Sequence, residues 1–346
     1  MASDPLIVHH RRSALTRSLG AVLACALLIG AVAMWGARPA GAAPSGDPIL
    51  ASTVVLTDQQ QEAARNEMTP WKAVVLGVVE GVTEYLPISS TGHLVVTQRL
   101  LDIGNDSATK DAADAYAIAI QFGAILAVLV LYRGRIELIM RGLIGRSSRG
   151  RRLLTSLVLA FLPAVVVGVG LEKPIKSHLL SPPAVVGAWI VGGIVLLIVA
   201  PRIRPDRPGV SLTSITPKQA LIIGAAQVLA MWPGTSRSLV TILAALAVGT
   251  TLAAAVEFSF LLGLMTLGAA TIYESAKNGS TVIDAYGVAS PLIGVVVAFV
   301  AAAAAIRWMV TWLQTRSLAI FGWERIAVAA ITIGLMVAGT ISAATV

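Results

Sequence analysis

The chain has 346 residues, of which 56% are hydrophobic and 13% are charged, and its mean hydropathy is +0.81. A soluble domain carries about 25% charged residues, so this composition excludes a soluble globular enzyme, a disordered chain and a nucleic-acid-binding module. Each helical membrane span needs about 20 mostly apolar residues. We therefore predict an all-α polytopic membrane protein. The single cysteine excludes an intrachain disulfide and a cysteine-based metal site.

The N-terminal extension has the organisation of a targeting segment. Three arginines within residues 9–17 precede an apolar run from Leu19 to Trp35, and small residues follow. This order predicts that residues 1–43 are a secretory signal peptide, with an uncleaved signal anchor as the alternative. Either one leaves the polar, Gln-rich residues 44–70 outside the cytoplasm as a tether.

Residues 71–346 are predicted to form an integral membrane domain with eight apolar segments. These cover about residues 71–100, 115–132, 153–171, 183–200, 219–248, 254–272, 290–313 and 325–345. The first and the fifth segments differ from the others, because each is interrupted by a proline and a cluster of Ser, Thr and Gly. Non-helical backbone at membrane depth is tolerated only where protein or water satisfies it, so both interruptions mark candidate functional sites.

The connections between the segments differ in their content of Lys and Arg. Thirteen such residues lie in three connections (133–152, 201–218 and 314–325), whereas the other three (101–114, 172–182 and 273–290) hold four. Connections rich in Lys and Arg lie in the cytoplasm. A self-consistent orientation then requires each interrupted segment to enter and leave on the same face. We predict six transmembrane helices plus two re-entrant helical hairpins.

The two interrupted segments resemble each other. Glu80 aligns with Gln227, and Ser90 aligns with Ser236 if one gap is allowed. Each copy is followed by three spans, so the halves, about 71–200 and 219–346, would have opposite topology. Interrupted helices at matching positions of an inverted-topology repeat indicate a binding site near the membrane midplane.

The chemistry of the two interruptions favours a phosphate ligand. Pro87 and Pro233 each end a half-helix, and the hydroxyl residues that follow are suited to cap the next one. A helix N-terminus offers free N–H groups and partial positive charge to a phosphate, and Arg237 adds a planar charged fork. The candidate binding residues are Ser89, Thr91, Gly92, Gly234, Thr235, Ser236 and Ser238.

Three ionisable residues of the first interrupted segment are candidates for catalysis. Glu80 and Glu84 share a helix face, where they could act as a general base, as ligands of a divalent cation such as Mg²⁺ or Ca²⁺, or as salt-bridge partners of Arg237. His93 is placed for proton transfer, with a satisfied core histidine as the alternative. Ionisable groups within membrane segments are usually functional.

The motifs EGVTEYLPISSTGH at residues 80–93 and PGTSRS at residues 233–238 resemble those of the undecaprenyl-diphosphate phosphatase family, also called the bacitracin-resistance family. The likeness extends to residues 121–128 and 257–262 and covers about residues 70–345. The first 70 residues depart from the family, which usually lacks such an extension.

The resemblance implies hydrolysis of undecaprenyl diphosphate to undecaprenyl phosphate and inorganic phosphate at the outer face of a bacterial cytoplasmic membrane. This reaction recycles the lipid carrier of peptidoglycan synthesis and confers bacitracin resistance. By motif, Glu80 and Glu84 match the family's acidic pair, and Ser90 matches its proposed nucleophile. His93 matches the motif histidine, and Arg237 matches the phosphate-binding arginine.

Several alternatives stay open at this point. The nucleophile is either Ser90 or a metal-bound water. A polyprenyl-phosphate transporter or flippase would use the same inverted-repeat architecture, although a carrier needs no nucleophile. Partners are the lipid substrate and membrane lipids but no nucleic acid. Ala-rich and Gly-rich spans permit close helix packing, either within the chain or in a homodimer.

Overall fold

The computed structural model describes residues 62, 65–105, 107–178 and 181–342. The predicted signal peptide or anchor and most of the predicted tether lie outside the described residues. Helices dominate the described part, which contains no β-strand longer than a single bridge, Val210 to Thr250. The predicted all-α class is therefore confirmed for the part of the chain that the structure describes.

Within those ranges, six helices are long and apolar enough to cross a membrane. They are α5 (Ser107–Leu131), α7 (Ser148–His178), α8 (Pro182–Val199), α11 (Leu252–Tyr286), α12 (Ala289–Trp312) and α13 (Ala319–Val337). All six coincide with predicted spans, so the protein is a multi-pass membrane protein.

Four shorter helices make up the two interrupted segments. They are α3 (Pro70–Thr83), α4 (Ser90–Leu100), α9 (Pro217–Gln227) and α10 (Arg237–Ala247). At about 1.5 Å per residue each is roughly 16 to 21 Å long, which is too short for a hydrocarbon core of about 30 Å. In each segment the two helices pack against each other.

The helices extend into several predicted connections. The basic connection after α5 contains α6 (Arg133–Leu143), and α11 continues to Tyr286, well beyond its apolar part. Short 3₁₀ turns lie at Ala200–Arg202 (η1), Leu212–Ser214 (η2) and Val228–Met231 (η3). Counting apolar residues locates a span but misses its polar helical continuations.

One predicted boundary is wrong in a way that matters for the site. The last span begins at Ala319 and not near residue 325, so Arg325 is part of α13 and is completely buried. Arg325 therefore belongs to a membrane-spanning helix and not to the basic connection 314–325. The adjacent charges of Glu324 and Arg325 interrupt the apolar pattern in the sequence, but in the structure both lie within the helix, where Glu324 contacts His93 and Arg325 contacts backbone carbonyls.

Each interrupted segment packs against a helix from the other half of the chain. Helix α3 lies along α12, and α9 lies along α7. A Cβ atom at Gly77 would lie 2.7 Å from the Gly294 carbonyl oxygen, and one at Gly224 would lie 2.3 Å from that of Ala160. Glycine is required at both contacts. The Ala-rich stretch of α12 packs on Gly81 of the same chain.

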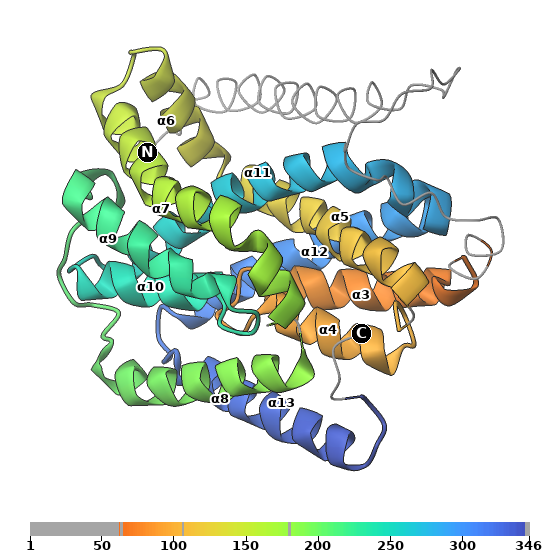
Figure 1. The fold of residues 1–346 in the computed structure, drawn as a ribbon. Coiled ribbons are helices and arrows are strands. Elements are labelled where there is room, and N and C mark those ends of the chain that lie inside the picture. Colours follow the sequence, from red (N-terminus) through yellow and green to blue (C-terminus); the bar gives the residue numbers. More distant parts are fainter. Residues whose placement is uncertain (1–61, 63–64, 106, 179–180, 343–346) are drawn as a thin grey trace, which may run out of the picture.

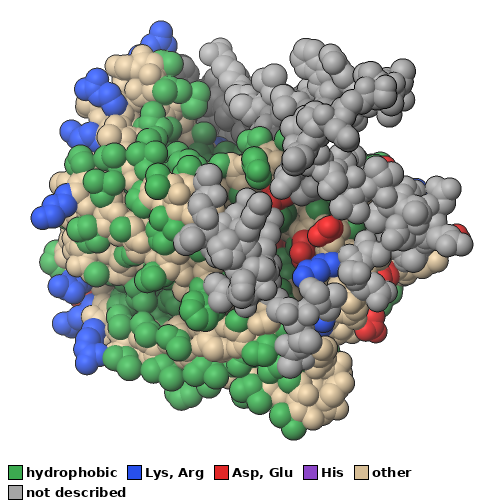
Figure 2. All heavy atoms as spheres, viewed as in Figure 1, with side chains coloured by type: hydrophobic (Ala, Val, Ile, Leu, Met, Phe, Trp, Pro, Cys, Tyr) green, Lys and Arg blue, Asp and Glu red, His purple; other side chains and the backbone are tan. Residues whose placement is uncertain are grey.

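The remaining spans complete the bundle. Helix α5 packs on α11. Helices α8 and α13 lie side by side along one edge of the bundle (Figure 1). Figure 2 shows Lys and Arg side chains gathered at the end of the molecule where the α6–α7 and α8–α9 connections lie. This clustering agrees with the grouping of basic connections in the sequence.

Candidate active site

The site is built from two similar backbone turns. Ser89 precedes α4 with φ 79°, and Ser236 precedes α10 with φ 75°. Each serine caps its helix, since Ser89 Oγ accepts from the Gly92 N–H at 3.5 Å and Ser236 Oγ accepts from the Leu239 N–H at 3.3 Å. Both turns therefore hold a helix N-terminus in the same local geometry.

These caps correct the alignment of the two interrupted segments. Ser236 is the counterpart of Ser89 and not of Ser90, because both serines have the same backbone conformation and the same cap. The separation in sequence is then equal to that between Glu80 and Gln227, so no gap is needed. Ser90 and Arg237 thereby occupy matching positions at the start of α4 and α10.

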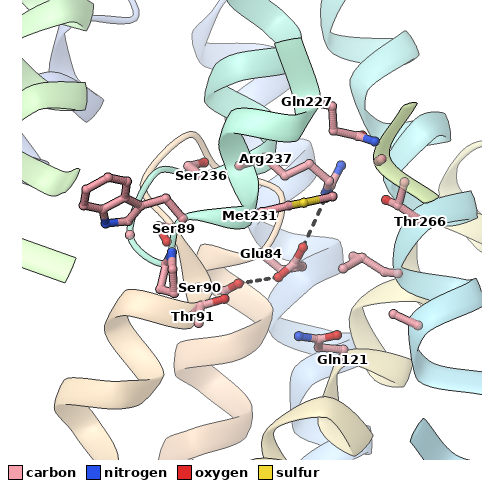
Figure 3. Close-up of a pocket in the computed structure, with 17 residues that line it drawn as sticks. Glu84, Ser89, Ser90, Thr91, Gln121, Gln227, Met231, Ser236, Arg237 and Thr266 are labelled. Atoms are coloured by element: carbon pink, nitrogen blue, oxygen red, sulfur yellow. Dashed lines mark hydrogen bonds and ion pairs between the residues drawn. The ribbon is translucent and has the colours of Figure 1, made fainter. Parts of the chain in front are cut away.

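A cavity of about 330 Å³ lies between the two turns. Its polar lining comes from α4, α5, α9, α10 and α11 and from the two turns, the first of which begins at Glu84, directly after α3. The polar side chains are Glu84, Ser89, Ser90, Thr91, Gln121, Gln227, Ser236, Arg237 and Thr266 (Figure 3). Apolar residues of α7, η3 and α11, including Ala164, Met231 and Leu267, complete the wall. The cavity thus has a polar side, suited to a phosphate, and an apolar side.

Glu84 is the centre of the polar side. Its Oε1 accepts a hydrogen bond from Arg237 Nη2 at 3.1 Å, and its Oε2 accepts one from the Ser90 hydroxyl (Figure 3). The carboxylate and the guanidinium are 5% and 12% exposed, so water screens the ion pair only weakly. The arrangement brings a hydroxyl, a base and a fixed positive charge to one place.

The position of Arg237 depends on neighbouring residues. Its Nη1 donates to the Ser259 carbonyl at 3.0 Å, and its guanidinium carbon lies 5.5 Å from the centre of the Tyr85 ring. A Cβ atom at Gly263 would lie 2.1 Å from Nη1. Because Gly263 has no side chain, the guanidinium of Arg237 can lie directly against its backbone. Arg237 itself lines the cavity, while its Nε is buried and has no hydrogen-bond partner.

Other predicted binding residues divide into two groups. Ser89, Thr91, Gly234 and Ser236 line the cavity, whereas Gly92, Thr235 and Ser238 do not. The Ser238 hydroxyl donates to the Leu86 carbonyl at 2.7 Å and so connects the two turns. A Cβ atom at Gly92 would lie 2.7 Å from the Trp189 ring. These two residues determine how the turns pack.

His93 also lies outside the cavity lining. Its Nδ1 lies 2.7 Å from the Ser89 carbonyl oxygen, and its Nε2 lies 2.9 Å from Glu324 Oε1. The ring packs against Trp189, with 4.9 Å between centroids. In this geometry both ring nitrogens are engaged away from Ser90, and the structure does not bring His93 to the predicted nucleophile.

The acidic pair suits a hard cation in its chemistry. Glu80 is completely buried, and neither of its carboxylate oxygens has a hydrogen-bond partner. A buried carboxylate without a partner is costly unless a proton or a cation neutralises it. Among the described residues no three His, Cys, Asp or Glu side chains form a group. The described residues therefore offer a cation these two carboxylates and no third such ligand beside them.

Sequence reasoning missed two amides in the cavity. Gln121 of α5 and Gln227 of α9 both line it, and neither amide atom of Gln227 has a partner (Figure 3). Gln227 was aligned with Glu80, and Gln121 is a polar residue within an apolar span. Both signals were present in the sequence, but neither residue was assigned to the site.

Comparison with known proteins connects this geometry to a family. The family model described as bacitracin resistance protein BacA matches residues 73–331, which include both turns and the cavity. The chain belongs to the BacA family. The resemblance seen in the two sequence motifs is thereby confirmed, and the first 72 residues lie outside the BacA match.

Several relatives of the BacA family carry the same name. An undecaprenyl-diphosphatase of Sorangium cellulosum is 44% identical over 266 residues, which is 76% of this chain and 85% of that protein. Undecaprenyl-diphosphatase 2 of Rhodospirillum rubrum is 41% identical over 271 residues, or 78% and 96% of the two chains. Undecaprenyl-diphosphatase 1 of Chromobacterium violaceum is also 41% identical, over 78% and 97%.

Proposed function

We propose that this protein hydrolyses undecaprenyl diphosphate to undecaprenyl phosphate and inorganic phosphate. The observation that carries the proposal is the contact of Ser90 and Arg237 with one carboxylate, Glu84, inside a cavity bounded by two helix N-terminal turns. The names of the BacA relatives supply the substrate.

Binding is the task of the positive groups. Arg237 and the free N–H groups at the starts of α4 and α10 face the same cavity, where they would hold the oxygens of the terminal phosphate. The Gln227 amide adds a neutral donor. Phosphoryl transfer depends mostly on such positioning and charge stabilisation, which these fixed groups provide without reorganisation.

Ser90 is the proposed nucleophile. As its Oγ attacks the terminal phosphorus, Glu84 takes the hydroxyl proton along their hydrogen bond. The bridging P–O bond breaks, and undecaprenyl phosphate leaves with the electron pair. Water then hydrolyses the phosphoserine and releases inorganic phosphate. The alternative retained from the sequence is direct attack by water, with Glu84 as its base.

A divalent cation, Mg²⁺ or Ca²⁺, is proposed as the cofactor. Glu80 and Glu84 would hold it, and it would supply positive charge that offsets the carboxylates and the diphosphate. The unpartnered oxygens of Glu80 support this assignment. The remaining steps fall to Arg237, Ser90 and Glu84.

The proposed location is a bacterial cytoplasmic membrane, with the cavity facing the extracytoplasmic side. The basic connections support a cytoplasmic position for the opposite end. The short helices support two re-entrant hairpins in an inverted repeat, and the exchange of packing partners between the halves agrees with it. In this location the enzyme would regenerate the lipid carrier of peptidoglycan synthesis and confer bacitracin resistance.

A phosphatase assay in detergent distinguishes the enzyme from a carrier. Purified protein is incubated with undecaprenyl diphosphate in micelles, where no transport is possible, and both products are quantified. We expect equal amounts of inorganic phosphate and undecaprenyl phosphate. Saturable binding of the substrate without release of phosphate would contradict the proposal and favour a polyprenyl-phosphate flippase.

A further inference from the structure

Arg325 is a second arginine at membrane depth, and its surroundings differ from those of Arg237. It lies on α13, it is completely buried, and its hydrogen bonds all go to backbone carbonyls. Its Nη1 donates to the Pro87 carbonyl at 3.3 Å, and its Nη2 donates to that of Gly234 at 2.7 Å. One side chain therefore contacts the backbone of both turns that bound the cavity.

The same guanidinium is also anchored to α8. Its Nη2 donates to the Ala188 carbonyl at 2.9 Å, and its Nε donates to that of Trp189 at 3.4 Å. A Cβ atom at Gly192 would lie 2.3 Å from Nη2, so glycine is needed for this approach. A planar fork with several donors can reach four carbonyls at once, whereas a lysine ammonium donates from a single point.

The neighbouring residue of α13 reaches the first turn by another route. Glu324 Oε1 lies 2.9 Å from His93 Nε2, and His93 Nδ1 lies 2.7 Å from the Ser89 carbonyl oxygen, so His93 bridges the two. Ser89 is the residue with positive φ that caps α4 and precedes Ser90. The chain from Glu324 through His93 thus ends on the strained residue beside the proposed nucleophile.

Neither side chain is part of the cavity lining. Arg325 nevertheless contacts the backbone of both turns, and Glu324 reaches the first turn through His93. Two further side chains also hold the turns. The Trp189 indole donates to the Ile88 carbonyl at 2.9 Å, and Ser238 donates to Leu86. A buried charge is stable when hydrogen bonds satisfy it, and removing it leaves several carbonyls unpaired.

We propose that Glu324 and Arg325 of α13 are positioning residues, which hold both turns in the geometry that presents two helix N-termini to one phosphate. Arg325 fixes the turns at Pro87 and Gly234 relative to each other. Glu324 acts on the first turn alone, through His93. The consequence for the reaction rests on the proposed phosphatase function, whereas the consequence for the turns does not.

Hydrogen–deuterium exchange measures the holding of the turns directly. The full-length protein in detergent is compared with Arg325→Lys, with Glu324→Ala, and with Arg316→Lys as an exposed control. In Arg325→Lys we expect faster amide exchange at residues 88–93 and at 235–240, with α5 and α12 unchanged. In Glu324→Ala only the first segment should exchange faster. The control should behave as the wild type.

Two exchange results would overturn the proposal. One is unchanged exchange in both turns of a folded Arg325→Lys protein, and the other is an equal increase throughout the chain, which would indicate a general loss of stability. If Arg325→Lys does not fold, Glu324→Ala decides the question, because Glu324 is partly exposed and its loss leaves Arg325 in place. An unchanged first turn in that variant would overturn the proposal.

Kinetics then test the link to the reaction. We expect kcat to fall by about tenfold or more in Arg325→Lys while KM changes by less than about threefold, because a displaced donor costs most in the transition state. His93→Gln and Glu324→Ala should lower kcat by similar factors, and the double variant should lose no more than either one. Additive losses, or a rise in KM alone, would contradict the positioning role. If the wild-type protein releases no phosphate, the proposed phosphatase function is contradicted, but the exchange experiment still tests whether Glu324 and Arg325 hold the turns.

Discussion

Two arginines beside the same pair of turns have different surroundings. Arg237 contacts a carboxylate and one carbonyl, borders the cavity and keeps an unpartnered Nε. Arg325 contacts four carbonyls and does not line this cavity. Each guanidinium lies against a glycine, Gly263 or Gly192 respectively. Both arginines thus lie against a glycine, but Arg237 is placed to contact a ligand, whereas Arg325 holds backbone segments together.

The difference lies in the partners of each guanidinium and in its position relative to the cavity. A guanidinium whose hydrogen bonds all go to backbone carbonyls holds the fold together, whereas one that lines a cavity beside a carboxylate can bind an anion. A charged residue within a membrane segment usually has a role, and its hydrogen-bond partners indicate whether that role is to bind a ligand or to hold the structure together. The following predictions test this contrast, starting with the largest effect.

Loss of the Arg237 side chain should have the largest effect. Arg237→Ala removes the charge that faces the transferred phosphate and should lower kcat/KM by about 10³-fold or more. Phosphate release in detergent measures the loss, and the melting temperature shows that the variant is folded. Arg237→Lys should recover only part of the activity, since it lacks the fork. Activity of Arg237→Ala within tenfold of wild type would remove this residue from the site.

Loss of the Ser90 hydroxyl should have the next largest effect. If Ser90 is the nucleophile, Ser90→Ala should lower kcat by at least about 10²-fold and abolish any phosphoenzyme trapped by acid quenching. Thr311→Ala, on α12 and outside the cavity lining, is the matched control for loss of a hydroxyl. Near-normal turnover in Ser90→Ala would exclude covalent catalysis and favour attack by water.

A methyl group added beside Arg237 should have a smaller effect. Gly263→Ala places a Cβ atom where the guanidinium lies, so it should displace the side chain and lower kcat/KM by about tenfold to a hundredfold. Gly268→Ala on the same helix meets nothing within 4 Å and is the matched control. Equal activity of the two variants would show that the position of Arg237 does not depend on Gly263.

Cation binding should give the smallest effect, a change in melting temperature. Added Ca²⁺ or Mg²⁺ should raise the melting temperature of the chelator-treated wild type, because a ligand that binds only the folded state stabilises it. Glu80→Gln should show little of this shift, and Glu274→Gln, on the distal part of α11, should retain it. A shift of wild-type size in Glu80→Gln would place the cation elsewhere.

The sequence was sufficient for the six spans, because long apolar runs and their basic connections have a physical signature in composition. It was also sufficient to identify the two turns, where proline and hydroxyl residues interrupt that signature. The environment of Arg325 could not be predicted, because a charged pair in an apolar segment looks like a helix boundary until its carbonyl partners are known. Likewise, the equivalence of Ser89 and Ser236 became clear from their φ angles and their helix caps.

The spatial relations within the site were the least predictable part. Nothing in the local sequence places Gly263 under the Arg237 guanidinium, or turns His93 toward Glu324 on a helix 231 positions away. The motifs assign Glu84, Ser90 and Arg237 to the site. The contact of Arg237 with the Glu84 carboxylate depends on how two distant helix pairs pack together. Such contacts follow from the fold and not from spacing along the chain.

The central claim is that both helix N-terminal turns and Arg237 hold one phosphate, and protection by inorganic phosphate tests it most directly. Amide exchange of the wild-type protein is measured with and without saturating phosphate, and the Arg237→Ala protein is measured in parallel. We expect phosphate to slow exchange at both residues 89–93 and 236–240 in the wild type, and at neither segment in the variant. Protection of one segment alone, or of none, would contradict a phosphate site shared by the two turns.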